Sequence, residues 1–558
     1  MRCSAWAWTA LVVSLAPCLC LAQGLNAADL YRALAQDWPT YSGDYSGRHY
    51  STLSQVNRTN VKHLSLAWAR RLPVSHDHVN DTVPTIVGGE VANPVPFGGP
   101  GADGARVAGA ILERHGILYV SAPDHAWAVD ARTGRVLWHY FWKSKGGTHI
   151  GNRGMAMHGN RLYFEVPDDY LIALDAATGK ELWHTAIADF DQQYFSTMAP
   201  VVVDNHLIIG TGNDMDAPGF LKSIDPITGK DQWTWWSTPH NKGDPGSETW
   251  PDEDSMRHGG GNVWIPGAFD PETRLYYFGT GNPNPVMSAG SRVGDNLYTS
   301  SLVALHVDTG KMAWYYQTAP HDTHDMDAAQ TPILIDGKFN GKPRKLLLNG
   351  NRNGYFFVLD RLTGEHLLTT PFSSSANWAG GLNVRGAPIG DPKKDAQVGG
   401  VLVSPSDPGI ANWPPATFSP RTGLYYLQAN ESYSEYYLTD TDPRNALGFG
   451  GVQEDMLGSL GRSVKAIDYR TGKIVWQIDY PLSYAVGGGL PGLLSTAGDL
   501  LFGADAAGNL VARDVANGRP LWHTMLGPVS NAPETYELDG RQYILIAATD
   551  TLYAFALD

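Results

Sequence analysis

The stretch ALDAATGKELW, residues 173–183, decides the fold, because variants of it recur along the chain. It consists of a strand that ends near Asp, a Thr-Gly turn, and a second strand that ends in Trp. Glycine accepts the positive φ that a hairpin turn requires, and Asp can bond its own backbone there. Six further segments share this pattern: AVDARTGRVLW (128–138), SIDPITGKDQW (223–233), ALHVDTGKMAW (304–314), VLDRLTGEHLL (358–368), AIDYRTGKIVW (466–476) and ARDVANGRPLW (512–522). The repeat therefore predicts many short strands joined by tight turns.

The spacing of the repeat indicates the architecture. Its turn glycines lie at 134, 179, 229, 310, 364, 472 and 518, so a basic period is near fifty residues. This period is typical of a four-stranded propeller blade, and the Trp is large enough to bridge one sheet to the next. We expect an all-β, eight-bladed β-propeller with Trp-docking repeats, which spans residues 23–558 as a single domain. Seven blades, or a parallel β-helix with shorter coils, are the alternatives.

Seven of the eight predicted blades carry the motif. The widest interval, between the glycines at 364 and 472, leaves room for a blade without it, and FSPRTGLYYLQANES (418–432) is its expected core. The terminal strands around LSLAW (64–68) and LYAFALD (552–558) are expected to close the ring. Inserts at 75–108, 235–262 and 370–412 are rich in Gly, Pro and Asp. Such loops usually carry the functional site of a scaffold of this kind.

The first 22 residues are predicted to be a secretory signal peptide. Arg2 precedes the apolar run AWAWTALVVSLAPCLCLA, and Ala22 offers a small residue for cleavage. Because Pro17 interrupts the run and no basic stop follows, we expect no stable membrane anchor. A lipid anchor at Cys18 is a weaker alternative, since Pro17 occupies a place that normally requires a small residue. The expected location is the periplasm.

The cysteine count and the net charge exclude several kinds of chemistry. All three cysteines lie within the predicted signal, so the mature chain lacks disulfides, thiolate metal sites and Cys-x-x-Cys-His haem attachment. The formal net charge of -15 argues against nucleic acid as a partner, since phosphate binding needs clustered Lys and Arg.

Four stretches resemble, in order and spacing, the pyrroloquinoline-quinone (PQQ) dependent alcohol and methanol dehydrogenases, also called quinoproteins. They are WPTYSGDYSGRHYSTLSQVNRTNVKHLSLAW (38–68), FDPETRLYYFGTGNPNP (269–285), GDNLYTSSLVALHVDTGKMAWYYQTAPHDTHDMDAAQ (294–330) and GKPRKLLLNGNRNGYFFVLDRLTG (341–364). PQQ is a flat tricarboxylate quinone, which needs an aromatic surface to stack on, cationic and hydroxyl groups for its oxygens, and a hard metal ion. The resemblance implies a site with these parts.

Matching the motifs assigns the cofactor contacts. Trp264 in GGGNVW falls on the stacking Trp, and Arg352 in NRNG falls on the Arg that contacts the quinone oxygens. Arg153 in GNRG and Thr197 in STMAP match carboxylate-binding positions. Asn377 and Trp378 are predicted to add a further contact. The structural alternatives are a blade-core Trp, a surface ion pair and an exposed hydroxyl.

The resemblance also implies a calcium or lanthanide ion. Asn282 in GTGN matches a metal-ligating Asn, and Asp325 in PHDTHDMD falls on the catalytic base beside the metal; a turn-forming Asn and a solvated loop Asp are the respective alternatives. Asp327 stands where lanthanide-dependent members carry an additional Asp, although it could be an ordinary loop carboxylate. The usual metal-binding Glu falls in GTGNDMDAPGF (210–220), where Asp214 is the nearest equivalent and Asp216 the alternative.

The sequence departs from the family's pattern at several positions. Gly147 and Thr148 replace a neighbouring cysteine pair, and Ala108 replaces a Glu that contacts the cofactor. His324 stands where an aromatic residue normally lies beside the base. His321 and His324 could also form a transition-metal pair, a weaker interpretation because i, i+3 spacing in a loop is a poor signal.

The functional prediction is a periplasmic quinoprotein dehydrogenase. It would oxidise a primary alcohol, or an aldehyde or other small hydroxyl substrate, by hydride transfer to PQQ with Asp325 as the base. Without a haem motif, its electrons would pass to a separate soluble cytochrome c. The alternative is a non-catalytic propeller that has lost the cofactor, and the changes at 108, 147–148 and 214 motivate it.

Overall fold

The computed structural model describes residues 30, 35–72, 83–89, 91–92, 106–147, 151–212, 214–443, 450–480 and 491–558. The predicted signal peptide, Thr148 and most of the 75–108 insert lie outside the described residues. Within them, eight sheets have four or five strands each, and one further hairpin has two strands. The all-β propeller is confirmed, and eight sheets are consistent with eight blades.

The sheets are numbered 1 to 8 in chain order. Sheet 1 contains β3 (Thr85–Gly88), β4 (Leu112–Arg114), β5 (Ile117–Ala122), β6 (His125–Asp130) and β7 (Val136–Trp142). Sheet 2 contains β8 (Ala156–His158), β9 (Arg161–Val166), β10 (Tyr170–Asp175) and β11 (Glu181–Ala186). Sheet 3 contains β12 (Val201–Val203), β13 (His206–Ile209), β14 (Phe220–Ile224) and β15 (Asp231–Trp236). Sheet 4 contains β16 (Ala268–Asp270), β17 (Leu275–Gly279), β18 (Ser301–His306) and β19 (Lys311–Gln317).

The second half of the chain continues this pattern. Sheet 5 contains β20 (Ile333–Phe339), β21 (Lys342–Gly350), β22 (Tyr355–Asp360) and β23 (His366–Pro371). Sheet 6 contains β26 (Val401–Val403), β27 (Thr417–Ser419), β28 (Leu424–Leu438), β29 (Val452–Asp468) and β30 (Ile474–Asp479). Sheet 7 contains β1 (Tyr50–Ser51), β31 (Leu494–Thr496), β32 (Leu500–Ala504), β33 (Asn509–Asp514) and β34 (Pro520–Met525). Sheet 8 contains β2 (Leu64–Arg71), β35 (Glu534–Leu538), β36 (Arg541–Ala548) and β37 (Thr551–Leu557).

The remaining elements lie in connections. They are the hairpin of β24 (Ala379–Leu382) and β25 (Pro388–Gly390), the short helix α2 (Glu253–Arg257), and the 3-10 turns η1 (Val61–His63), η2 (Phe190–Gln192) and η3 (Ser247–Thr249). None of the helices in the described part of the chain has both the length and the apolar character that a membrane crossing demands.

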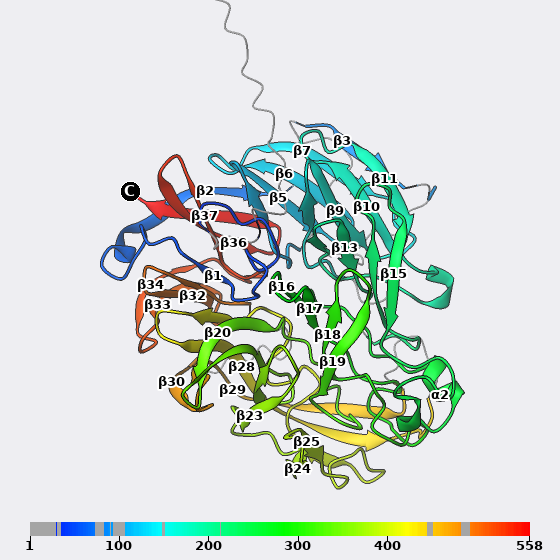
Figure 1. Cartoon of the computed structure of the whole chain (residues 1–558). Helices are drawn as coiled ribbons and strands as arrows, with labels where there is room; N and C mark the ends of the chain where they lie inside the picture. Colours follow the sequence, from blue (N-terminus) through cyan, green and yellow to red (C-terminus); the bar gives the residue numbers. More distant parts are fainter. Residues whose placement is uncertain are drawn as a thin grey trace, which may run out of the picture.

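The sheets follow one another around a common centre, and red β37 lies beside blue β2 (Figure 1). The first strands of neighbouring sheets contact one another, as β8 does β12 and β16 does β20, and β27 of sheet 6 contacts β31 of sheet 7, so these strands lie nearest the centre. Apolar side chains fill the spaces between sheets, and one cluster joins Trp127 of sheet 1 to Tyr536 of sheet 8. The predicted pairing of the terminal strands is confirmed, because β2 is antiparallel to β37 in sheet 8.

The repeated motif forms the last hairpin of sheets 1 to 7, and its residues act as predicted. Asp175 accepts hydrogen bonds from the backbone N–H of Thr178 at 2.9 Å and from its hydroxyl at 2.7 Å, while Gly179 has a φ of 70°. The Trp138 indole of the preceding sheet covers this turn, and its Nε1 donates to the Ala176 carbonyl at 3.0 Å. A Cβ on Gly179 would lie 2.6 Å from the Trp138 ring. Trp233, Trp314 and Trp476 donate to a turn carbonyl of the following sheet in the same way, whereas Leu368 replaces the Trp of the fifth motif.

One part of the blade prediction is wrong. Residues 418–432 do not form a blade of their own, because they lie in β27 and β28 of the same sheet 6 that holds the motif at 466–476. The wide interval is taken up by a long connection before β27 and by the extended β28–β29 hairpin. The eighth sheet is instead made from the two ends of the described chain.

This topology places the site. In an antiparallel meander, the start of the first strand and the end of the second strand lie at the same end of the sheet. Arg153, Thr197 and Trp264 precede the first strands of sheets 2, 3 and 4, whereas Asn282 and Arg352 follow the second strands of sheets 4 and 5. The predicted site residues therefore gather on one face.

Candidate functional site

Three buried aspartates form a compact cluster. Asp214, Asp325 and Asp327 each offer a carboxylate oxygen, and these oxygens lie within 4.8 Å of one another. Asp214 lies between β13 and β14, and the other two precede β20. Among the described residues no other cluster of three or more His, Cys, Asp or Glu side chains has this spacing. The sequence-predicted metal ligands thus come together from two sheets.

The backbone at two of these residues is unusual. Asp214 has a φ of 58° and Asp325 a φ of 59°, which is the left-handed region that non-glycine residues seldom adopt. Strained conformations of this kind persist where the surrounding structure imposes them, and they concentrate at functional sites. Asp216, the alternative to Asp214, instead lies 3.1 Å from the His258 ring.

Asp327 is held by three donors. Its Oδ1 accepts from the backbone N–H of Asn282 at 2.5 Å, and its Oδ2 accepts from Trp264 Nε1 at 3.1 Å. Arg352 Nη1 donates to the same Oδ2 at 2.8 Å. The carboxylate therefore connects the predicted stacking Trp, the predicted metal-binding Asn and the predicted quinone-binding Arg.

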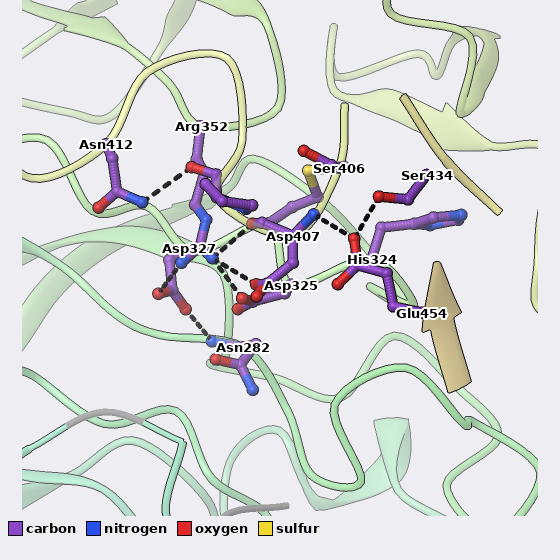
Figure 2. A network of polar contacts seen from close by, with 12 residues as sticks. Asn282, His324, Asp325, Asp327, Arg352, Ser406, Asp407, Asn412, Ser434 and Glu454 are labelled. Atoms are coloured by element: carbon purple, nitrogen blue, oxygen red, sulfur yellow. Dashed lines mark hydrogen bonds and ion pairs between the residues drawn. The ribbon is translucent and has the colours of Figure 1, made fainter. Parts of the chain in front are cut away.

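Arg352 links the cluster to a fourth carboxylate, as Figure 2 shows. Its Nη2 pairs with Asp325 and also donates to Asp407, at 2.6 Å to the carbonyl and 3.1 Å to Oδ1. Burial alone would lower the pKa of the Arg352 guanidinium, but the surrounding aspartates outweigh burial and raise it. Arg352 thus stays charged. A planar guanidinium suits this arrangement, because its five donors form a fixed fork.

One arginine does not neutralise the cluster. Burial, more than any neighbour, raises the pKa of Asp325 well above its usual range and that of Asp327 to about 6. Oδ1 of Asp325 is buried and accepts no hydrogen bond from a described donor. Buried carboxylates this close ionise together only when further positive charge joins them. The donor set consists of hard oxygens, which fits calcium or a lanthanide.

Trp264, Arg153 and Thr197 form the adjoining part of the site. The Arg153 Cζ lies over the Trp264 ring, 4.4 Å from its centroid, and over the Trp413 ring at 5.0 Å. Arg153 Nη1 donates to the Thr197 carbonyl at 3.0 Å, and the buried Thr197 hydroxyl has no partner among described atoms. Burial lowers the pKa of Arg153 to about 10, so it stays cationic at neutral pH. A flat anionic ligand on Trp264 would displace this guanidinium and keep it as a counter-ion.

Asn377 and Trp378 lie apart from these groups. The Asn377 side chain accepts from the Ser404 N–H at 2.8 Å and donates to Leu402, and Trp378 Nε1 donates to the Asn353 carbonyl at 2.9 Å. Neither shares a hydrogen bond or ring contact with Trp264 or with the three aspartates in the described structure. Their predicted role in cofactor binding stays a prediction.

The two histidines of HDTHD bind main-chain atoms. His321 Nδ1 lies 2.7 Å from the Gly294 carbonyl, and His324 Nε2 lies 2.8 Å from the Lys394 carbonyl. His324 Nδ1 also lies 2.9 Å from the Thr323 hydroxyl. These contacts favour a structural role over the alternative of a transition-metal pair.

Two neighbours of the site were not foreseen. Asp407 belongs to the long connection before β27, and its partner Arg352 is distant in sequence. Trp413 had a usable signal, because it stands four residues before β27 just as Trp264 stands four residues before β16. Equivalent positions in two blades are brought to the same face of the molecule.

A cavity of about 280 Å³ adjoins Arg153 and Trp413. Ala108 lines it, which is the position of the expected cofactor-binding Glu, and Tyr41 and Glu534 contribute polar atoms. The chain brings Gly147 close to Pro167, since a Cβ there would lie 2.8 Å from Pro167 Cβ. The cavity provides room beside the predicted stacking surface.

Comparisons with known proteins agree on one family. Residues 38–377 match the family described as glucose/ethanol/alcohol dehydrogenase, β-propeller domain, and residues 461–558 match that of the outer membrane protein assembly factor BamB. The quinohemoprotein alcohol dehydrogenase ADH IIB of Pseudomonas putida is 34% identical over 95% of this chain and 76% of its own length. The quinoprotein alcohol dehydrogenase PedH of Pseudomonas putida is 32% identical over 90% of this chain and 84% of its own.

Solved structures show the same likeness. The quinohemoprotein alcohol dehydrogenase of Comamonas testosteroni superposes with a TM-score of 0.81 at 30% identity, covering 96% of this chain and 82% of that chain. A europium-containing methanol dehydrogenase superposes with a TM-score of 0.80 at 26% identity, covering 95% of this chain and all of its own.

Proposed function

Because this chain belongs to the family of PQQ-dependent glucose, ethanol and alcohol dehydrogenases, we propose that it oxidises a primary alcohol with PQQ as its prosthetic group. The observation that carries the proposal is the buried network in which Asp325, Asp327 and Arg352 meet beside Trp264. An aldehyde or another small hydroxyl compound is the alternative substrate.

We assign the main cofactor contacts to the chain's own residues. Trp264 would form the stacking surface, Arg153 and Thr197 would bind carboxylates, and Arg352 would contact the quinone oxygens. The metal ion would be held by Asp214, Asn282, Asp325 and Asp327. Three aspartates against one arginine leave an excess of negative charge, which a divalent or trivalent ion would offset.

Asp325 is the proposed general base. Its Oδ2 is held by Arg352, while its buried Oδ1 accepts no hydrogen bond from the described residues and can take the hydroxyl proton of the alcohol. When bound, PQQ supplies the acceptor for the hydride, which leaves the carbon atom that carries the hydroxyl group of the alcohol. Arg352 orients the carboxylate and stays cationic throughout, because its pKa is raised by its aspartate partners against the effect of burial.

We place the enzyme in the periplasm, with a soluble cytochrome c as its electron acceptor. No Cys follows Cys20, so this sequence contains no Cys-x-x-Cys-His motif to attach a haem. We propose that a separate acceptor takes the electrons. The alternative of a non-catalytic scaffold is less favoured, because a scaffold would have no need to bury three clustered aspartates.

Asp325→Asn tests the proposal. The variant keeps the shape of the side chain but cannot act as a base, so kcat for alcohol-dependent reduction of an artificial acceptor should fall by about 10³-fold or more. Asp336→Asn, at an exposed aspartate on β20, is the matched control and should retain activity. PQQ bound by each protein is measured separately. Full activity in Asp325→Asn with PQQ bound would exclude Asp325 as the base.

A further inference from the structure

The cavity beside Arg153 lies at the centre of the propeller. It is lined by residues that precede or begin the first strands of several sheets: Ala110 before β4, Arg153 before β8, Pro415 before β27, Gly492 before β31, and Glu534 in β35. Since the first strands lie nearest the centre, the cavity lies on or close to the propeller axis. Its volume is about 280 Å³, and it adjoins the site that contains Trp264, because Arg153 lines the cavity and its guanidinium lies over both the Trp264 and the Trp413 rings.

Two polar groups in this cavity lack partners among the described residues. Glu534 is 1% exposed, and its Oε1 accepts from the Ile111 N–H at 2.8 Å, whereas its Oε2 has no hydrogen bond to a described atom. Tyr41 is 5% exposed, and its hydroxyl likewise has no partner in the part of the chain that the structure describes. Leaving a buried polar group unpaired is costly, so such groups usually face a ligand or ordered water.

These two groups and Arg153 interact electrostatically. The pKa of Tyr41 is raised by burial first, with Arg153 opposing the rise and Glu534 adding to it. All three side chains line the same cavity, so they can contact one ligand. Ala108, which lines the same cavity, cannot contribute a polar side chain of its own.

We propose that Glu534 and Tyr41 bind a carboxylate-bearing edge of PQQ in this cavity, so that sheet 8 supplies the carboxyl group that Ala108 lacks. This inference rests on the proposed function. Burial raises the pKa of Glu534 well above its usual range, which favours the protonated carboxyl, and a protonated Oε2 can donate to a ligand carboxylate, as the Tyr41 hydroxyl can. Arg153 supplies the positive charge, and the hydrogen bonds from the two neutral donors fix the orientation of the ligand carboxylate.

The test measures PQQ binding to the purified apoprotein, with calcium or lanthanum added, by equilibrium dialysis and by quenching of tryptophan fluorescence. Glu534→Leu should raise the Kd more than about tenfold, and Tyr41→Phe should raise it about threefold or more. Glu534→Gln should stay within about threefold of the wild type, since its amide still donates a hydrogen bond. Glu537→Ala, on the same strand but outside the cavity, is the control and should bind as the wild type does.

A second substitution separates ligand binding from a structural role. If Glu534 replaces the Glu absent at 108, then Ala108→Glu introduced into Glu534→Leu should recover most of the lost affinity. A purely structural Glu534, acting through Ile111, would show lower stability in Glu534→Leu without a change in Kd, and no recovery. Tyr41→Phe keeps the ring in place, so it tests the inference even where Glu534→Leu does not fold.

The two failures are distinguishable. Wild-type protein that binds no PQQ with either ion would refute the proposed function and the inference with it. Wild-type protein that binds PQQ, while Glu534→Leu and Tyr41→Phe bind it equally well, would refute the inference and leave the proposed function standing.

Discussion

Arg352→Met should destabilise the metal-free protein by about 3–5 kcal/mol at pH 8. The substitution keeps most of the apolar volume but removes a buried charge that contacts Asp325, Asp327 and Asp407. Breaking a buried ion pair on one side has this cost, because it leaves the other charge uncompensated. The contact with Asp407, whose side chain is 32% exposed, adds little to the total.

The destabilisation caused by Arg352→Met should become smaller at lower pH, because the two aspartates become protonated there. A carboxyl whose folded pKa exceeds its unfolded value stabilises the fold fully below the unfolded pKa, and this contribution is lost as pH rises through the folded pKa. For Asp327 that range runs from its ordinary value near 4 to about 6, and burial is the main cause. Arg352 lowers the pKa of both aspartates. In its absence their folded pKa values are higher, so the pH range over which the contribution is lost extends to higher pH. Both carboxyls are then protonated at pH 5, and the cost of the substitution falls below about 2 kcal/mol.

The assay is urea unfolding in EDTA at pH 5 and pH 8, followed by tryptophan fluorescence and circular dichroism. Arg421→Met removes an exposed ion pair with Asp499 and should cost less than about 1 kcal/mol at either pH. Excess calcium or lanthanum should restore much of the stability of Arg352→Met at pH 8, because the cation takes over the charge compensation. An unchanged midpoint at pH 8, or an equal loss at both pH values, would refute this account of the acidic cluster.

Three further predictions concern the metal, the cofactor and the fold. Asp327→Ala should weaken lanthanide binding more than calcium binding, by about tenfold or more in the ratio of Kd values from isothermal titration calorimetry, and equal losses would contradict a lanthanide role. Trp264→Ala should raise the Kd for PQQ more than tenfold by equilibrium dialysis, while retained affinity would show that the cofactor does not stack there. Gly179→Ala should lower the free energy of unfolding by about 1–3 kcal/mol in urea, since its Cβ would meet the Trp138 ring and its φ is positive, whereas the same change at exposed Gly399 should have little effect.

The repeat was enough to predict the all-β propeller and the closing strands, because each motif contains its own turn chemistry and its own inter-sheet contact. The prediction of a separate blade around residue 418 was wrong, because the spacing of motifs cannot distinguish a further blade from a long connection followed by the extended hairpin β28–β29.

The residues of the candidate site likewise fall into those that the sequence could predict and those that it could not. Asp325 and Asp327 could be assigned from one short segment, and Arg352 from its turn. Asp214 was already the nearest equivalent in the sequence, and the folded chain adds the physical reason to prefer it, because there Asp216 lies beside His258 and Asp214 beside the other carboxylates. Glu534 was out of reach, since its significance depends on a cavity shared with residues some four hundred positions earlier.

The central claim is that this chain is a PQQ-dependent alcohol dehydrogenase. The most direct measurement is the rate of acceptor reduction by purified wild-type protein with a primary alcohol, with PQQ and with calcium or a light lanthanide, and with each component omitted in turn. We expect turnover only when alcohol, PQQ and one of the two ions are all present. Bound PQQ and metal without alcohol-dependent turnover, across a panel of alcohols and aldehydes, would contradict the account.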